Sequence, residues 1–237
     1  MNSLTLSTPA LSVPGTPLAR LSRGVSTFQR GFYRRNKRHF VSLARHGQTP
    51  HTLFITCSDS RVDPGALTST LPGELFMVRN IGNLVHPHSQ DGGECRAVAS
   101  AIEYATHALG ITDIVVCGHS HCGACASLYS DGHVADLAHT QQWMREGLKV
   151  KEQLLARAPR DIVELKRSRE ATQQLLRATE KAMVVNSLNN LLTYPAVQAG
   201  LEEGRLALHG WHYMLETGEI EHYRPDTRAF APLGAAS

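Results

Sequence analysis

The segment LFITCSDSR, at residues 53–61, is the part of this 237-residue chain that decides its fold. It begins with the short apolar run LFIT, which is typical of a buried strand and ends at Cys57. A second run of the same kind, IVVC at residues 114–117, opens the segment that continues as GHSHCGAC. Helical patterns separate these runs, and strands that alternate with helices predict a parallel sheet with right-handed crossovers.

The remaining elements follow outward from these two strands. Further parallel strands are predicted at residues 74–78 and 205–211, and an edge strand at residues 219–223. Helices are predicted at residues 28–46, 92–109, 141–158 and 168–192, the first of them a basic arm. The expected fold is therefore α/β: a central, mainly parallel four-stranded sheet with an antiparallel edge strand, flanked by helices and preceded by an N-terminal helical arm.

Composition divides the chain into three predicted parts. Residues 1–27 lack clear periodicity, and they contain residues that oppose a regular helix, namely Pro9, Pro14, Gly15 and Pro17. This segment is expected to be flexible, and its acid-poor character also resembles a cleavable organelle transit peptide. Residues 28–223 are expected to form one domain that includes the helical arm, and residues 224–237 a C-terminal tail.

Charge and cysteine usage limit the partners and the compartment. No acidic residue precedes Asp59, but the formal net charge of +3 is too small to indicate nucleic-acid binding. No apolar run approaches the roughly 20 residues that a membrane-spanning helix needs, so no membrane association is expected. The odd count of five cysteines does not resemble a disulfide framework. A cytoplasmic protein is predicted, with targeting to an organelle through residues 1–27 as the alternative.

Cysteine and histidine residues follow the two decisive strands and form a candidate metal site. Sites in open α/β sheets form beyond the carboxyl ends of the strands, where Cys57 can meet His119 and Cys122. Two thiolates and one imidazole suit zinc, and three protein ligands leave a fourth position open, as in catalytic sites. The alternative is a local structural site made of Cys117, His119, Cys122 and Cys125, but it leaves the segment CSDSR unexplained. Cys117 is otherwise interpreted as a core residue.

Asp59 and Arg61 lie just beyond the first strand and are the candidate catalytic residues. A carboxylate paired with an arginine stays ionised, and it can accept a hydrogen bond beside the metal and fix its orientation. Alternatively, Asp59 moves onto the metal as a fourth ligand and closes the site.

The two segments CSDSR, at residues 57–61, and CGHSHCG, at residues 117–123, together resemble the pattern of the β-class carbonic anhydrases. Supporting similarity lies in GQTP at residues 47–50, PGELFMVRNIGN at 72–83, AIEYA at 101–105 and GWHY at 210–213. The resemblance implies reversible hydration of carbon dioxide to bicarbonate and a proton by attack of a zinc-bound hydroxide. It also implies one Zn²⁺ per chain. Two thiolate ligands donate more charge than imidazoles, so the zinc-bound water should be less acidic and the activity should rise toward alkaline pH.

The resemblance assigns roles by position. It implies zinc binding by Cys57, His119 and Cys122, with Asp59 as the gate and Arg61 as its partner. It places substrate-binding side chains at Gln48, Phe76 and Tyr104, the last two as apolar walls of a pocket that a dimer often completes. A homodimer or a dimer of dimers is therefore expected.

Two questions stay open at this level. Phe54 occupies the position at which bicarbonate-regulated relatives carry a tryptophan, so the plant-like subtype with an open zinc site is favoured over the closed, regulated one. The alternative functions are a zinc hydrolase of a related cumulene such as carbon disulfide, an inactive zinc-stabilised scaffold, and a basic nucleic-acid binder that uses residues 1–46.

Overall fold

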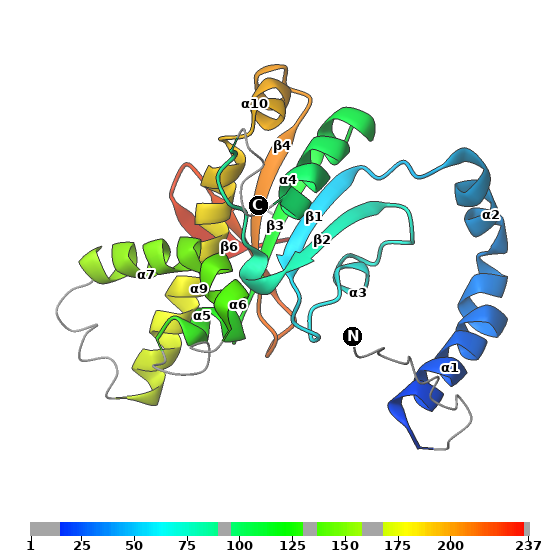
Figure 1. Cartoon of the computed structure of the whole chain (residues 1–237), viewed down its shortest axis with the longest axis horizontal. Coiled ribbons are helices and arrows are strands. Elements are labelled where there is room, and N and C mark those ends of the chain that lie inside the picture. The colour runs from blue at the N-terminus through cyan, green and yellow to red at the C-terminus, as the bar shows by residue number, and fades with distance from the viewer. Residues whose placement is uncertain (1–14, 90–95, 130–136, 158–167, 235–237) are drawn as a thin grey trace, which may run out of the picture. The chain divides into compact units, whose positions relative to one another are not determined.

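The computed structural model describes residues 15–89, 96–129, 137–157 and 168–234. The chain forms two compact units, residues 1–48 and residues 49–237, which are described separately. Figure 1 shows the helices of the first unit and the sheet and helices of the second.

The first unit consists of α1 (Pro17–Phe28), the π-helical turn η1 (Gln29–Tyr33) and α2 (Lys37–His46). Helix α1 corrects the expectation that no regular helix forms before residue 28. Its first residue is a proline, and the position is tolerated because the N–H that proline lacks has no partner in a first helical turn. Thr16 caps the helix, since its side-chain oxygen accepts a hydrogen bond from the Ala19 N–H at 3.2 Å.

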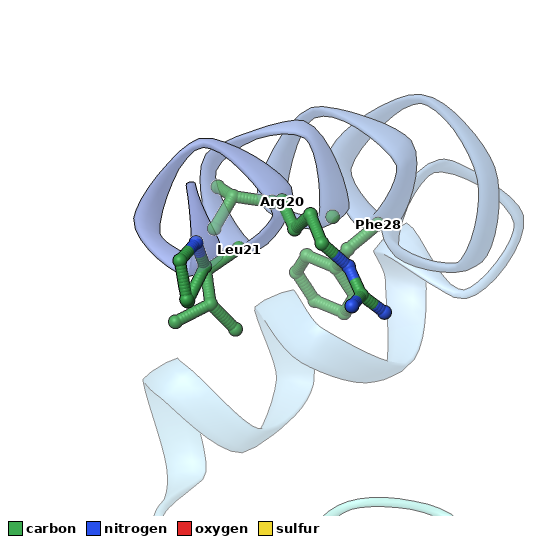
Figure 2. Close-up of a pocket in the computed structure, with 6 residues that line it drawn as sticks. Arg20, Leu21 and Phe28 are labelled. Atoms are coloured by element: carbon green, nitrogen blue, oxygen red, sulfur yellow. The ribbon is translucent and has the colours of Figure 1, made fainter. Parts of the chain in front are cut away.

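The predicted arm over residues 28–46 is helical but interrupted. Asn36 has φ −104° and ψ 18°, outside the helical region, so a break separates η1 from α2. Aromatic rings of Phe28, Phe32, Tyr33 and Phe40 pack against one another across this break, with centroids 5.1–6.1 Å apart. On α1, exposed apolar side chains line a hollow beside Arg20, among them Leu21 and Phe28 (Figure 2).

The second unit is built on one six-stranded sheet with the order β2-β1-β3-β4-β5-β6. The strands are β1 (Thr52–Cys57), β2 (Leu75–Asn80), β3 (Asp113–His119), β4 (Ala207–Tyr213), β5 (Ile220–Arg224) and β6 (Ala229–Pro232). The first four strands are parallel, whereas β5 and β6 continue the sheet in antiparallel pairing (Figure 1). The predicted α/β fold and its parallel core are confirmed, and β6 is an additional edge strand that the sequence did not indicate.

Helices and short turns connect the strands of this unit. The described ones are α3 (Pro64–Thr68), η2 (Ile81–Asn83), α4 (Arg96–Glu103), η3 (Tyr104–Ala108), α5 (Gly123–Ser127), α6 (Ala138–Trp143), α7 (Arg145–Arg157), α9 (Arg169–Leu191) and α10 (Pro195–Glu202). Within the described ranges, no helix combines the length and the apolar character needed to cross a membrane.

Both faces of the central strands are buried, which explains why β1 and β3 read as continuous apolar runs. On one face Leu53, Ile55 and Ile114 belong to the main core, which includes Ile102 of α4 and Leu188 of α9. A smaller cluster on the opposite face contains Phe54, Val115 and Trp211. Alternate residues of one strand thus serve two separate cores.

Helix α9 lies close against β3 and β4 because glycines face it. A Cβ atom on Gly118 would lie 2.7 Å from Cγ2 of Val184, and one on Gly210 would lie 2.8 Å from Cδ1 of Leu188. Such distances are shorter than side chains tolerate, so the two glycines permit this approach. The close packing brings α9 beside the carboxyl end of β3, which carries His119.

Candidate metal centre

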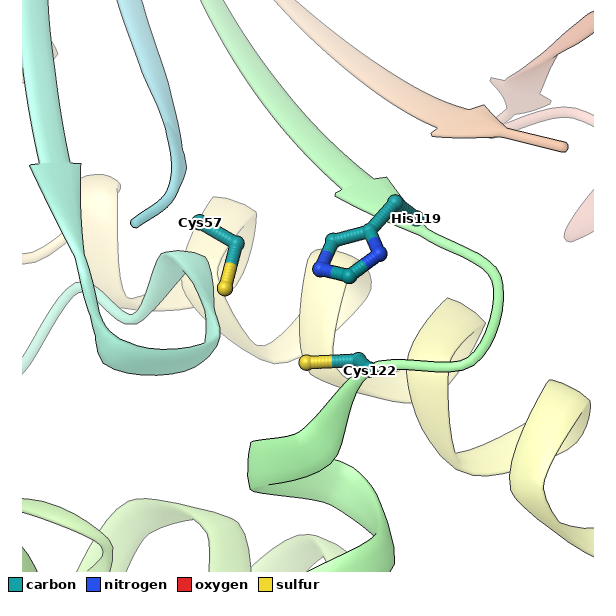
Figure 3. A group of neighbouring side chains, drawn as sticks. All are labelled: Cys57, His119 and Cys122. Carbon is teal, nitrogen blue, oxygen red and sulfur yellow. The ribbon is translucent and has the colours of Figure 1, made fainter. Parts of the chain in front are cut away.

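Three predicted ligands meet at the carboxyl edge of the sheet. Cys57 is the last residue of β1 and His119 the last of β3, and these strands are adjacent and parallel. Cys122 follows on the turn into α5, at the N-cap position. The two sulfur atoms and one imidazole nitrogen lie within 4.8 Å of one another, and all three residues are buried (Figure 3).

The imidazole of His119 is oriented by its neighbour in the chain. Its Nδ1 lies 2.8 Å from the carbonyl oxygen of Ser120, which can only accept, so Nδ1 carries the proton. Nε2 of the neutral ring therefore presents a lone pair. This nitrogen is buried and has no hydrogen-bond partner among the residues that the structure describes, a costly arrangement unless a metal or another donor engages it. A carbonyl that fixes the second nitrogen is common for histidine ligands.

The two thiols are poor acids in this environment. The pKa of Cys57 is raised to about 12 by hydrogen bonding with the Cys122 thiol and by burial. The pKa of Cys122 is also raised, first by hydrogen bonding with Cys125 and further by burial. A divalent cation reverses this preference, because thiolates are the form that binds metal and the cation compensates their charge. The donor set of two sulfurs and one imidazole nitrogen fits zinc.

Cys117 and Cys125 do not belong to this cluster. Cys117 ends the apolar run of β3 but is fully buried in the core on the far face of the sheet. Cys125 is buried in α5 beside Cys122, yet it does not belong to the cluster whose ligand atoms converge. Cys95 lies outside the described residues. The geometry therefore favours the ligand set that spans two strands over the local set at residues 117–125.

Asp59 and Arg61 form a tight pair beside the cluster. Nε of Arg61 donates to Oδ1 of Asp59 at 2.9 Å, and Nη2 donates to Oδ2 at 2.8 Å. These bonds hold the pKa of the Asp59 carboxyl well below its usual range. Oδ2 of Asp59 also lies 3.9 Å from Nε2 of His119, so an ionised carboxylate borders the space between the candidate ligands.

The backbone that carries Cys57 and Asp59 is held from the neighbouring strand. Arg79 of β2 donates from Nε to the carbonyl oxygen of Cys57 at 3.2 Å and from Nη2 to that of Asp59 at 2.7 Å. Nη2 of Arg61 donates in addition to the carbonyl oxygen of His121 at 3.0 Å. Two arginines thus connect the segment after β1 to β2 and to the turn after β3.

Of the three predicted substrate residues, two lie away from this cluster within the second unit, and one belongs to the first unit. Gln48 is the last residue of the first unit. Phe76 of β2 pairs with Leu53 of β1, and Leu53 precedes Cys57 by four residues. At about 3.3 Å per strand residue, Phe76 therefore lies about 13 Å from the cluster along the strands. The ring of Phe76 contacts that of Tyr104, with centroids 5.8 Å apart, and Tyr104 is half exposed. Within one chain these two aromatics form a separate pair at the edge of β2.

Three charged residues around the centre were missed by sequence reasoning. Oε1 of Glu180 accepts a hydrogen bond from the Cys122 N–H at 3.1 Å. Glu216 accepts one from Oγ of Ser120 at 2.6 Å. Arg177 contacts both carboxylates. Glu180 could have been noticed in the sequence, because it is a carboxylate among the buried residues of α9. The sequence does not show, however, that Glu180 binds the Cys122 N–H.

Comparison with known proteins agrees with this arrangement. The family model described as "Carbonic anhydrase" matches residues 52–220. A carbonic anhydrase of Pseudomonas aeruginosa is 41% identical over 211 residues, which cover 89% of this chain and 89% of that relative. The solved structure of the β-carbonic anhydrase CcaA has a TM-score of 0.79 and 33% identity, and it covers 92% of this chain and 100% of its own.

A second solved structure extends the likeness to fungi. One of the two tetrameric β-carbonic anhydrases of Sordaria macrospora has a TM-score of 0.72 and 25% identity, with coverage of 86% of this chain and 95% of its own. The family match, which spans most of the chain, and the shared fold agree with the cysteine and histidine cluster at the sheet edge. The chain therefore belongs to the carbonic anhydrase family and is an enzyme of its β class.

Proposed function

We propose that this carbonic anhydrase hydrates carbon dioxide with one zinc ion per chain, bound by Cys57, His119 and Cys122. The observation that carries the proposal is the unpartnered Nε2 of His119, which lies buried beside two thiols. Each protein ligand has the chemistry that zinc prefers, and a set of three leaves one position for substrate chemistry. When bound, the zinc ion supplies the Lewis acidity that lets water act as a nucleophile near neutral pH.

The chain's own residues then orient the reaction. Asp59 stays ionised because Arg61 neutralises it, so its carboxylate is an acceptor and not a donor. It would accept a hydrogen bond from the O–H group of the nucleophile and so direct the oxygen lone pair toward carbon dioxide. Arg61 keeps Asp59 in this orientation and draws it away from the fourth ligand position. This role corresponds to the open form of the site.

We further propose roles for the three predicted substrate residues. Gln48 donates its amide hydrogen bond to a substrate oxygen, and Phe76 and Tyr104 form apolar walls of the pocket of a neighbouring subunit. The half-exposed ring of Tyr104, which packs on Phe76 at the edge of β2, supports an interface there. These roles imply a homodimer or a dimer of dimers, and the similar β-carbonic anhydrase of Sordaria macrospora is tetrameric. The described cysteines are all free, which suits the reducing cytoplasm.

Stopped-flow hydration of carbon dioxide with a pH-indicator dye, on protein of measured zinc content, tests this function. Fast hydration is expected, with activity that rises toward alkaline pH because two thiolate ligands make the bound water less acidic. Cys57→Ser is expected to lose both zinc and activity, because it removes one of three ligands.

Cys117→Ala and Cys125→Ala are the matched controls. Both remove a buried thiol near the site, and both are expected to retain zinc because neither thiol belongs to the cluster. Zinc loss in Cys125→Ala together with retention in Cys57→Ser would favour the local structural site. One zinc per chain without hydration at alkaline pH would redirect the proposal to another cumulene, such as carbon disulfide.

A further inference from the structure

A carboxylate is buried directly behind one of the candidate zinc ligands. Glu180 of α9 is 2% exposed, and its Oε1 accepts the backbone N–H of Cys122 at 3.1 Å. A buried charge is costly unless partners compensate it. Glu180 has two such partners, because Nε2 of the fully buried His212 lies 3.1 Å and Nη1 of Arg177 3.4 Å from its Oε2.

Arg177 joins this buried carboxylate to a second one at the surface. Its Nη2 donates to Oε1 of Glu216 at 3.0 Å. Glu216 in turn accepts Oγ–H of Ser120 at 2.6 Å and lies 2.5 Å from Nε2 of His121. Both carboxylates therefore bind the ligand turn, defined as residues 119–122, which begins at the last residue of β3 and carries His119 and Cys122. One guanidinium links the two carboxylates.

The ligand turn needs such support because its backbone is strained. His121 has φ 55°, in the left-handed region that non-glycine residues rarely adopt. The helix that follows, α5, has five residues and no side-chain hydrogen bond at its N-cap, so it cannot fix Cys122 by itself. The hydrogen bond from the Cys122 N–H to Glu180 instead ties this backbone to the long, well-packed helix α9.

We propose that Glu180, supported by Arg177 and His212, is a positioning residue that holds Cys122 in place as a zinc ligand. This inference rests on the proposed zinc site. It adds to that site a residue that is not itself a zinc ligand. Glu180 is not one of the three residues whose ligand atoms converge. It acts through the Cys122 N–H, whose charge-assisted hydrogen bond is stronger than one to a neutral acceptor.

Glu180→Gln is the sharpest variant because it keeps the shape of the side chain. Cys122 N–H, His212 and Arg177 all donate toward Glu180, whereas glutamine offers one acceptor oxygen and brings two donor hydrogens of its own. At least one buried donor then loses its partner, and the Cys122 backbone becomes less restrained. Arg177→Met is the second variant, which removes the bridge but leaves His212 on Glu180.

Thr179→Val is the matched control on the same helix. Thr179 is fully buried and hydrogen-bonded to the hydroxyl of Tyr129 at 2.8 Å, but it makes no hydrogen bond to the ligand turn. This variant therefore loses a buried polar contact of α9 without the proposed positioning. It separates a specific effect on Cys122 from general loosening of the helix.

The experiment measures zinc transfer from the full-length holoenzyme to a chromogenic chelator, and the absorption spectrum of the cobalt-substituted protein. Glu180→Gln is expected to release zinc at least about tenfold faster and to alter the cobalt–thiolate bands, as loss of outer-shell partners does, while Thr179→Val stays within about twofold of wild type. Arg177→Met is expected to shift both readouts in the same direction, and it decides the test if Glu180→Gln does not fold.

Unchanged release and unchanged cobalt bands in both Glu180→Gln and Arg177→Met would overturn the proposal. Equal acceleration in Thr179→Val would overturn it as well, since the effect would then be general. Wild-type protein that binds no zinc would instead refute the proposed function, so the two failures are distinguishable.

Discussion

Asp59 and Arg61 are joined by two parallel hydrogen bonds, and the same carboxylate lies 3.9 Å from Nε2 of His119. Asp59 lies two residues and Arg61 four residues beyond the end of β1, so the strand that positions Cys57 also positions the carboxylate. The guanidinium makes Asp59 an ionised acceptor and limits its freedom to turn toward the metal position. The short segment from Cys57 to Arg61 thus carries both a candidate zinc ligand and the carboxylate beside the fourth coordination position.

Asp59→Asn is expected to lower kcat/KM for carbon dioxide hydration by about 10- to 100-fold, the range typical for residues that orient a metal's surroundings. The amide cannot act as a charged acceptor, and its NH₂ group faces the donors of Arg61. Zinc content should stay at that of the wild type, because Asp59 is not one of the three clustered ligands. Stopped-flow kinetics and metal analysis check this, and undiminished kcat/KM would contradict the role of Asp59.

Zinc binding is expected to release about two protons per ion at pH 7.5, because thiols must ionise to bind metal. The pKa of Cys57 is raised to about 12 by the Cys122 thiol and by burial, and that of Cys122 is raised too. Both thiols are therefore protonated without metal at this pH. The apparent affinity should consequently rise with pH.

Isothermal titration of zinc in two buffers of different ionisation enthalpy counts these protons. Cys57→Ser should bind too little zinc to release a measurable number of protons, whereas Cys117→Ala should match wild type, because Cys117 lies outside the cluster. A wild-type count near zero would contradict a site with two thiolates.

The parts of this protein that could be predicted from sequence depend on local patterns. The apolar runs are sufficient to predict the parallel strands. They also predict that Cys57 and His119 lie close together, because neighbouring parallel strands end at the same edge of a sheet. Helix α1 is not predicted, because proline inside a helix normally ends it. Pro17 occupies the first turn of α1, where proline is tolerated.

The supporting contacts could not be predicted, since they join residues far apart in the chain. Glu180 meets the Cys122 N–H across 58 positions, and Glu216 meets Ser120 across 96. No motif links such pairs, because their meeting depends on how α9 and the turn after β4 pack on the finished sheet.

Gly118→Ala is expected to destabilise the fold by about 1–3 kcal/mol, the usual cost of overpacking a core. The added Cβ would lie 2.7 Å from Cγ2 of Val184, so α9 must move away from β3 next to His119. Val184→Ala should partly rescue the variant, because it removes the atom in conflict. A double-mutant cycle of urea unfolding measures the coupling. Additive effects of the two substitutions would contradict a direct clash.

Glu216→Gln is expected to lower the melting temperature most at neutral pH. Hydrogen bonds from Ser120, His121 and Arg177 lower the pKa of Glu216 from 4.5 to about 2. A carboxyl with a lowered folded-state pKa stabilises the protein fully above its unfolded value and loses that contribution as pH falls through the folded one. The difference in melting temperature between wild type and Glu216→Gln should therefore be constant above pH 5 and shrink as pH falls from about 4.5 toward 2.

The size of this difference should be modest, since the Glu216 side chain is 42% exposed and water screens its charge. Glu202→Gln, on the exposed surface of α10, is the matched control and should show no such dependence on pH. Thermal unfolding followed by circular dichroism between pH 7 and pH 3.5 provides the comparison. If the difference for Glu216→Gln persists or widens in acid, the ionised carboxylate is not what binds Ser120 and the ligand turn.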